Sequence, residues 1–297
     1  MLDFKGELAA LLAAFLWASS SVVYSRLGQQ ISPLFLNFLK GAIALLLLAF
    51  TVIITNSQLP NLDLTPVLFL ITSGVIGIGF GDTVFFFSLK YLGPKRASLL
   101  ETLAPPLAGI IAFIFLEETL SVYAWLGIVF TVLGVAAVIS ERTSDQTLSS
   151  RNLKLGILFG LGGAIAQAVG AVLSRSALID FNLNPLWSTI IRMTAGTISL
   201  IPLLLPIRHE LTPPSLQWTW RLTGIIFITA FAGTYLGIWL QQISLKFAAT
   251  GIAQTLSSTS PLFVLPIAAF FLKETITLRA VFGVFIAVAG IALLFLP

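Results

Sequence analysis

Four charged residues lie inside long apolar stretches of this sequence: Lys40, Asp82, Glu101 and Arg192. On membrane-insertion scales, a charged side chain at the centre of an apolar helix costs about 2.5–3.5 kcal/mol, so such residues usually pair with one another or face a cavity. These side chain types suit ion pairing, proton exchange and the binding of charged groups.

Lys40 and Glu101 are expected to form an ion pair. Lys40 lies seven residues after Pro33 and Glu101 seven residues after Pro94. Each is therefore about 10 Å of helix rise from the same, predicted cytoplasmic, face. The pair would be either a gate that closes on the cytoplasmic side or a structural ion pair. Snorkelling towards the lipid headgroups is the third interpretation.

Arg192 has the same place as Lys40 in an internal repeat, but no acid lies within the later apolar segments to neutralise it. Its planar guanidinium suits a carboxylate of a bound substrate, and snorkelling is the alternative. Asp82 lies deeper. It is interpreted either as the carrier of a coupling proton or as a buried, hydrogen-bonded carboxyl group without such a role.

Polar and aromatic side chains share one face on several apolar segments. Spacing of i, i+3, i+4 and i+7 places Trp17, Ser20, Ser21 and Tyr24 on one helical face. Lipid favours neither hydroxyls nor amides, so these faces are expected to line a cavity that binds a small molecule. Core packing of the aromatic residues is the alternative. The other candidates for such lining are Gln167, Ser174, Tyr235, Trp239, Gln242, Lys246, Gln254, Ser257, Ser258 and Ser260. The substrate-binding residues predicted from this set are Arg192, Trp17, Ser21, Tyr24, Gln167, Tyr235, Trp239, Gln242, Gln254 and Ser258.

The composition explains why such side chains need a cavity. Only 9% of residues are charged and 57% are hydrophobic, with a mean hydropathy of +1.02. In soluble globular domains about a quarter of all residues are charged, so this class of protein is excluded. The net charge of +4 is spread over segment ends and indicates no nucleic acid partner. The only histidine, His209, lies in a loop and no metal-ligand or nucleophile–base motif occurs, so neither an enzyme nor a cofactor or metal is expected.

The apolar segments predict an all-α integral membrane protein. A helix needs about 20 mostly apolar residues to cross the bilayer, and helices satisfy their own backbone polar groups. Pro105 and Pro261 fall within two of the segments and are expected to kink them. The ten expected spans are 7–27, 33–54, 66–90, 95–116, 121–140, 154–177, 184–206, 218–244, 250–272 and 277–296.

An internal repeat organises these spans. Residues 88–119 recur as residues 244–275, 156 positions downstream and without a gap. The predicted organisation is a five-helix repeat over 1–140, a linker at 141–153 and a second five-helix repeat over 154–297. Because five is odd, the second copy would enter the membrane from the opposite side, giving inverted repeats around a central cavity.

Basic residues predict the orientation, since cytoplasmic loops carry an excess of lysine and arginine. Three basic residues, Lys5, Arg175 and Lys246, belong to one face. The other face carries eleven: Arg26, Lys90, Lys95, Arg96, Arg142, Arg151, Lys154, Arg208, Arg221, Lys273 and Arg279. The linker is therefore expected in the cytoplasm and both termini outside, in the cell membrane.

Glycines recur every seven residues in the last helix of each repeat, at Gly127 and Gly134 and at Gly283 and Gly290. Each pair forms a smooth stripe that permits close helix packing. The stripe would serve either packing within the chain or a homodimer seam, so the expected state is a monomer or possible homodimer.

The chain resembles paired EamA domains of the drug/metabolite transporter superfamily over nearly its whole length. The residues that carry the resemblance are 97–100 (ASLL), Pro105 and 116–120 (LEETL), with Pro261, 272–275 (LKET) and the spaced glycines in the second half. The resemblance implies a ten-helix carrier that moves small metabolites, such as amino acids, by alternating access, here in the direction of export. An intramembrane enzyme and a membrane scaffold without transport are the alternatives.

Overall fold

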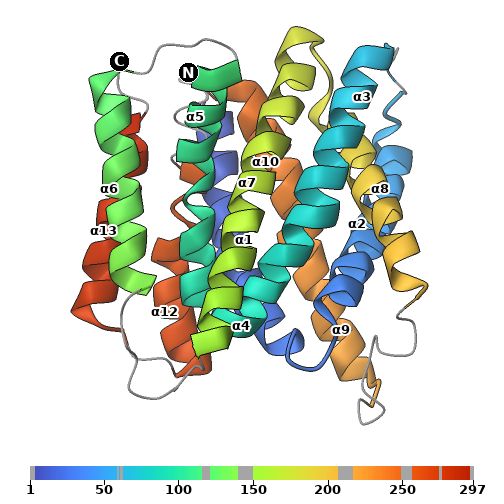
Figure 1. The fold of residues 1–297 in the computed structure, drawn as a ribbon. Helices are drawn as coiled ribbons and strands as arrows, with labels where there is room; N and C mark the ends of the chain where they lie inside the picture. The colour runs from blue at the N-terminus through green and yellow to red at the C-terminus, as the bar shows by residue number, and fades with distance from the viewer. Residues whose placement is uncertain are drawn as a thin grey trace.

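The structure is a computed structural model in which every described element is helical (Figure 1). It describes residues 4–58, 60, 63–115, 121–139, 150–206, 217–248, 256–273 and 276–294. No strand occurs within these residues. Gln254 and most of the expected linker, up to residue 149, lie outside them.

The first half of the chain contains six α-helices and one π-helix among its described residues. Its elements are α1 (Lys5–Leu27), α2 (Pro33–Thr55), α3 (Leu64–Ser73), the π-helix η1 (Gly74–Gly81), α4 (Asp82–Glu101), α5 (Ala104–Phe115) and α6 (Val122–Ile139). Inside α4 the chain turns at Gly93, whose φ of 76° and ψ of 172° are not helical. Pro94 follows this turn, which lies between the third and fourth expected spans.

The second half repeats this order of elements. It contains α7 (Ser150–Asp180), α8 (Pro185–Leu204), α9 (Trp220–Thr229), the π-helix η2 (Ala230–Leu236), α10 (Gly237–Phe247), α12 (Ser260–Leu272) and α13 (Leu278–Leu294). The two π-helices start 156 residues apart, at Gly74 and Ala230, so this irregularity follows the sequence repeat.

Six described helices are long and apolar enough to cross a membrane: Lys5–Leu27, Pro33–Thr55, Leu64–Glu101, Ser150–Ile179, Pro185–Leu204 and Trp220–Phe247. Shorter apolar helices are Trp125–Val138, Ser260–Leu272 and Leu278–Leu293. By length and composition, the protein is an all-helical, multi-pass membrane protein.

Local sequence explains where several helices begin and end. Proline stands at the first position of α2 and of α8, where its missing N–H costs nothing. Asn184 caps α8, since its Oδ1 accepts a hydrogen bond of 2.8 Å from the Leu186 N–H. Asn56 ends α2 in the left-handed conformation, with φ 46°.

The two halves are interleaved in space. α1 packs on α10 and α12 of the second half, and α7 packs on α4 and α5 of the first half. The π-helices follow the same rule, because η1 contacts α7 and α8 while η2 contacts α1 and α2. The space between the halves is therefore bounded by elements of both.

The last helices of the two halves, α6 and α13, form a pair at one side of the bundle (Figure 1). The glycine stripes lie in this seam. A β-carbon at Gly134 would come within 2.5 Å of the Ala287 backbone nitrogen, and one at Gly290 within 2.5 Å of that of Thr131. The stripes therefore serve close packing within the chain, as the first of the two interpretations predicted.

Candidate functional site

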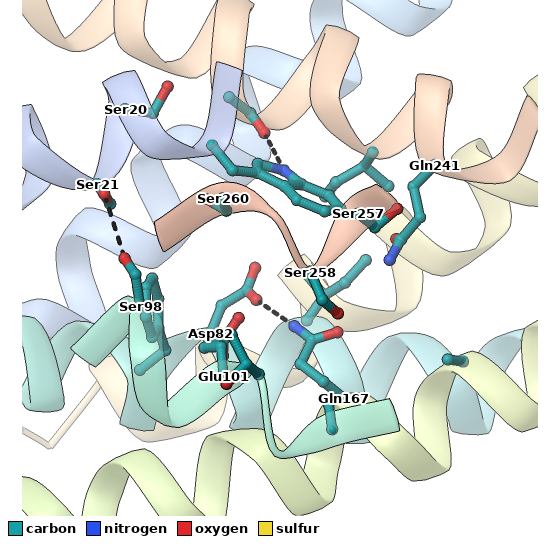
Figure 2. Close-up of a pocket in the computed structure, with 18 of the residues that line it drawn as sticks. Ser20, Ser21, Asp82, Ser98, Glu101, Gln167, Gln241, Ser257, Ser258 and Ser260 are labelled. Atoms are coloured by element: carbon teal, nitrogen blue, oxygen red, sulfur yellow. Dashed lines mark hydrogen bonds between the residues drawn. The ribbon is translucent and has the colours of Figure 1, made fainter. Parts of the chain in front are cut away.

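A cavity lies between the two halves and receives side chains from both (Figure 2). The space between its lining atoms, including the part open to solvent, is about 1180 Å³. Figure 2 shows the carboxyl groups of Asp82 and Glu101, the amide of Gln167 and the hydroxyl of Ser258 directed towards this space. All four charged residues that the sequence places inside apolar segments line it.

Two helix breaks border the cavity at equivalent positions of the repeat. α4 ends at Glu101 and α5 begins at Ala104, and a turn at residues 258–259 precedes α12. Pro105 and Pro261 follow these breaks and line the cavity. A proline removes one helical hydrogen bond and crowds the preceding turn, so the kinks expected there are present as breaks.

Lys40 forms an ion pair with Asp82, between the Nζ and Oδ2 atoms. Gln167 of α7 donates a hydrogen bond of 3.1 Å from Nε2 to the other Asp82 carboxylate oxygen. The ring centroid of Phe86 lies 5.2 Å from the Lys40 ammonium group, which allows a cation–π contact. The expected pairing of Lys40 with Glu101 is therefore wrong in its partner.

Counting residues from the helix ends could not show which of the two acids, Asp82 or Glu101, pairs with Lys40. Asp82 lies eight residues before Lys90, near the same end of the bundle from which the depth of Lys40 was counted. By helix rise Asp82 lies about 12 Å and Glu101 about 10 Å from that end, so depth alone permits either pairing, and the direction in which each helix presents its side chain decides it. That direction depends on the turn at Gly93 and on the π-helix η1. A regular α-helical period in the sequence predicts neither of them.

Glu101 keeps an unsatisfied carboxylate oxygen. Its Oε1 is buried and has no hydrogen-bond partner within the part of the chain that the structure describes. A β-carbon at Gly163 of α7 would lie 3.5 Å from this oxygen, so the glycine leaves room beside it.

Arg192 is 2% exposed and lines the same cavity. Its Nε and Nη1 atoms are buried and have no hydrogen-bond partner among the described residues. A glycine of η1, Gly77, faces the guanidinium: a β-carbon there would lie 3.5 Å from Nη2. A buried guanidinium with free donors has the chemistry to bind an anionic group.

The predicted face of α1 lies where the periodicity placed it. Trp17, Ser20, Ser21 and Tyr24 all line the cavity. The Trp17 indole donates a hydrogen bond of 3.0 Å to the Gly233 carbonyl in η2. Gln167 and Ser258, also predicted, line it too.

The predicted face of the eighth span is a different face from the one that lines the cavity. Tyr235 forms a hydrogen bond of 2.7 Å with Thr51, and Trp239 packs in an apolar cluster between α2 and α8. Gln242 is fully buried and its Oε1 accepts hydrogen bonds from Ser174 at 2.7 Å and Ser188 at 2.9 Å. These three side chains belong to the packing of the bundle. The residues of this span that line the cavity are Gly233, Thr234, Ile238 and Gln241.

The repeat itself carried the signal that periodicity missed. The first-half counterparts of Thr234, Ile238 and Gln241, 156 residues earlier, are Ile78, Asp82 and Phe85, and all three line the cavity. The position of Asp82 would therefore have identified the cavity-facing side of η2 and α10. Lining residues outside the predicted substrate-binding set also include Ser98, Thr102 and Phe86.

Comparison with known proteins gives the family. The model of the EamA-like transporter family matches residues 4–140 and again residues 154–296. The uncharacterized transporter YyaM of Bacillus subtilis is 32% identical over 206 residues, which cover 69% of this chain and 64% of YyaM. An uncharacterized transporter of Archaeoglobus fulgidus is 25% identical over 98% of both chains.

A solved crystal structure has the same fold. It aligns with 97% of this chain and 95% of its own chain, with a TM-score of 0.70 and 15% sequence identity. The double family match and the relatives' names indicate a membrane transporter rather than an enzyme. This chain belongs to the EamA-like transporter family.

Proposed function

We propose that the protein is a secondary transporter that exports a small polar metabolite, such as an amino acid, by alternating access through the cavity between its halves. The observation that carries this proposal is Arg192, a buried guanidinium in that cavity whose Nε and Nη1 atoms have no hydrogen-bond partner among the described residues. An uncompensated buried charge is costly, so a cavity of this kind suits a substrate that brings the opposite charge.

The connections between helices support two inverted five-helix repeats. In Figure 1 the α1–α2 connection lies at the lower end of the bundle and the α7–α8 connection at the upper end. Hydrogen bonds join further connections to each of these. Gln29 donates to the Lys90 carbonyl at 2.8 Å, and Lys246 donates to Asn182 Oδ1 at 2.9 Å. With ten spans and the basic residues counted above, the linker would face the cytoplasm and both termini the outside.

The two ends of the cavity differ in a way that suits alternating access. Towards the predicted cytoplasmic end, Tyr24 and Phe86 belong to an apolar cluster with Leu27, Leu36 and Leu89. Towards the other end, Gln242, Ser174 and Ser188 form a hydrogen-bonded polar cluster. Opening one closed end while the other stays closed would move the site between the two sides without a continuous pore.

Within this proposal, Arg192 binds an anionic part of the substrate, and Trp17, Ser21, Tyr24, Gln167 and Ser258 line the site around it. The proposed site no longer includes three of the residues predicted from the sequence, Tyr235, Trp239 and Gln242, which pack behind the cavity wall. Lys40 and Asp82 act as one neutral unit in the wall, beside which the substrate passes.

Purified protein in proteoliposomes tests the proposal with a panel of radiolabelled amino acids and organic acids. Arg192→Lys keeps the charge but loses the planar fork, so transport of a carboxylate substrate should fall, and Arg192→Met should reduce it further. Arg221→Met is the matched control, since Arg221 is an exposed arginine of α9. Near-normal transport by a well-folded Arg192→Met protein would exclude this role. Inside-out and right-side-out vesicles report the direction.

A further inference from the structure

The charges of the cavity do not all cancel locally. Tyr24, Lys40, Asp82, Glu101 and Arg192 are the titratable side chains among its lining residues. The ion pair neutralises Lys40 and Asp82. One acid and one base, Glu101 and Arg192, then remain with buried atoms that have no partner in the described part of the chain.

Lys40 is the cation that acts on the Glu101 carboxyl group, but it is already paired with another acid. The Lys40 ammonium group is bound to Asp82, which is itself a carboxylate that repels Glu101. α7 presents a glycine beside the free oxygen, at Gly163, and not a donor. A buried carboxylate oxygen without a partner among the described residues favours a proton or a bound cation, because leaving the charge uncompensated is costly.

The helix break adds further negative potential at the same place. Glu101 is the last residue of α4, so it lies at the negative end of that helix. Residues 105 and 106 are both proline, so the carbonyls of Glu101 and Thr102 lack the N–H groups that would bind them in a continuous helix. The local backbone and the side chain therefore favour positive charge together.

The second half provides an internal comparison. Its break also precedes a proline, Pro261, but the next residue is Leu262 and not a second proline, and the residue equivalent to Glu101 is Ser257. Ser257 lines the cavity and carries no charge. A helix break before a proline thus occurs twice among the described residues, whereas the second proline and the carboxylate accompany only the first.

We propose that Glu101 is the coupling site of the transporter, occupied in turn by a monovalent cation, a proton or Na⁺, and by the cationic group of the substrate. The inference rests on the proposed function. A substrate that carries both charges would place its anionic group on Arg192 and its cationic group on Glu101. The cation and the substrate then compete for one carboxylate, so each leaves as the other enters, and the inward flow of the cation drives export.

Cation binding is tested first without substrate. The thermal unfolding midpoint of the purified full-length protein is measured in NaCl and in choline chloride at equal ionic strength, at an acidic and at an alkaline pH. Because a ligand that binds only the folded state raises this midpoint, bound Na⁺ should raise it at alkaline pH. A proton as the coupling cation should instead give a pH response without a Na⁺ response.

The variants assign the response to one carboxyl group. Glu101→Gln and Glu101→Ser, the latter carrying the residue of the equivalent second-half position, should lose the Na⁺ response or the corresponding part of the pH response. Ser257→Ala is the matched control and should keep it. A response of unchanged size in a folded Glu101 variant, or no response to either cation in the wild type, would overturn the proposal.

Transport then tests the coupling. In proteoliposomes, an imposed Na⁺ or pH gradient should accelerate wild-type transport at least tenfold, and Glu101→Gln should lose this acceleration. If the wild type moves none of the tested substrates but the Glu101-dependent cation response is present, the cation site stands and the proposed transport fails. If gradient-driven transport is unchanged in Glu101→Gln, transport stands and the coupling site is wrong.

Discussion

The two walls of the cavity share a backbone plan and differ in their side chains. Positions 156 residues apart face the same space, yet Asp82 corresponds to Ile238 and Glu101 to Ser257. In contrast, Pro105 matches Pro261 after the two breaks, and η1 matches η2. The duplicated features shape the cavity, whereas the features that occur once give it a charge distribution. A symmetric scaffold can therefore carry an asymmetric site.

The same contrast holds at the ends of the cavity. Phe86 belongs to an apolar cluster, and its counterpart Gln242 belongs to a hydrogen-bonded one. Under the proposed alternating access, opening these two ends would therefore require different kinds of energy. Opening the apolar end costs the free energy of exposing apolar surface. Opening the polar end breaks the hydrogen bonds between Gln242 and its serines, so each polar group needs a new partner.

The largest expected effect concerns the ion pair, which lies wholly within the first half. Asp82→Asn leaves the buried Lys40 charge without its partner and should destabilise the protein by about 3–5 kcal/mol. The double variant Lys40→Met with Asp82→Asn should recover much of this loss. Unfolding in a denaturing detergent titration measures both. A double variant no more stable than Asp82→Asn would mean that the pair is not the source of the cost.

An intermediate effect is expected where the two halves remain alike. Gly134→Ala and Gly290→Ala both insert a methyl group against backbone atoms in the α6–α13 seam, and overpacking of this kind costs about 1–3 kcal/mol. The same titration should give similar losses for the two variants.

Gly224→Ala in α9 is the control for this pair, because no atom lies within 4 Å of the added β-carbon. It should leave stability nearly unchanged. A loss of stability at one seam glycine but not at the other would show that the two glycine positions are not energetically equivalent, although both pack against backbone atoms.

The smallest expected effect concerns the polar end. Ser188→Ala removes one of the two hydroxyl donors to Gln242 Oε1, while Ser174 remains. The loss in stability should be about 0.5–1.5 kcal/mol, as for one hydrogen bond. Hydrogen exchange of α8 and α10 should increase in this variant, with Ser199→Ala, which loses only a bond within α8, as the control. Unchanged exchange would mean that the cluster does not hold this end closed.

Features that depend on local chemistry or on the repeat could be read from the sequence. Pro33, Pro185 and the Gly93-Pro94 turn fixed helix limits close to the expected ones. The lining face of α1 followed from helical spacing because that helix is regular throughout. The ten spans, the inverted topology and the role of each lining residue stay predictions.

Features that depend on rotation about a helix axis could not be read in the same way. Two polar faces of the eighth span were available, one through Tyr235 and one through Gln241. Only contacts with α2, α7 and α8 determine which of them packs against the bundle. The predicted partner of Lys40 was wrong for the same reason. Depth along a helix limits which residues can meet, but it does not give the direction in which their side chains point.

The interleaving of the halves has a consequence for biogenesis. α1 is the first helix to leave the ribosome, but its neighbours α10 and α12 are synthesised more than two hundred residues later. During that interval Trp17 lacks its hydrogen-bond acceptor, the Gly233 carbonyl of the second half. Lys40 and Asp82 are in a different position, since only 42 residues separate them and both can meet in the nascent first half. Early pairing would relieve two insertion penalties before Arg192 is made. The contacts of α1 with α10 and α12 can form only after those helices are made.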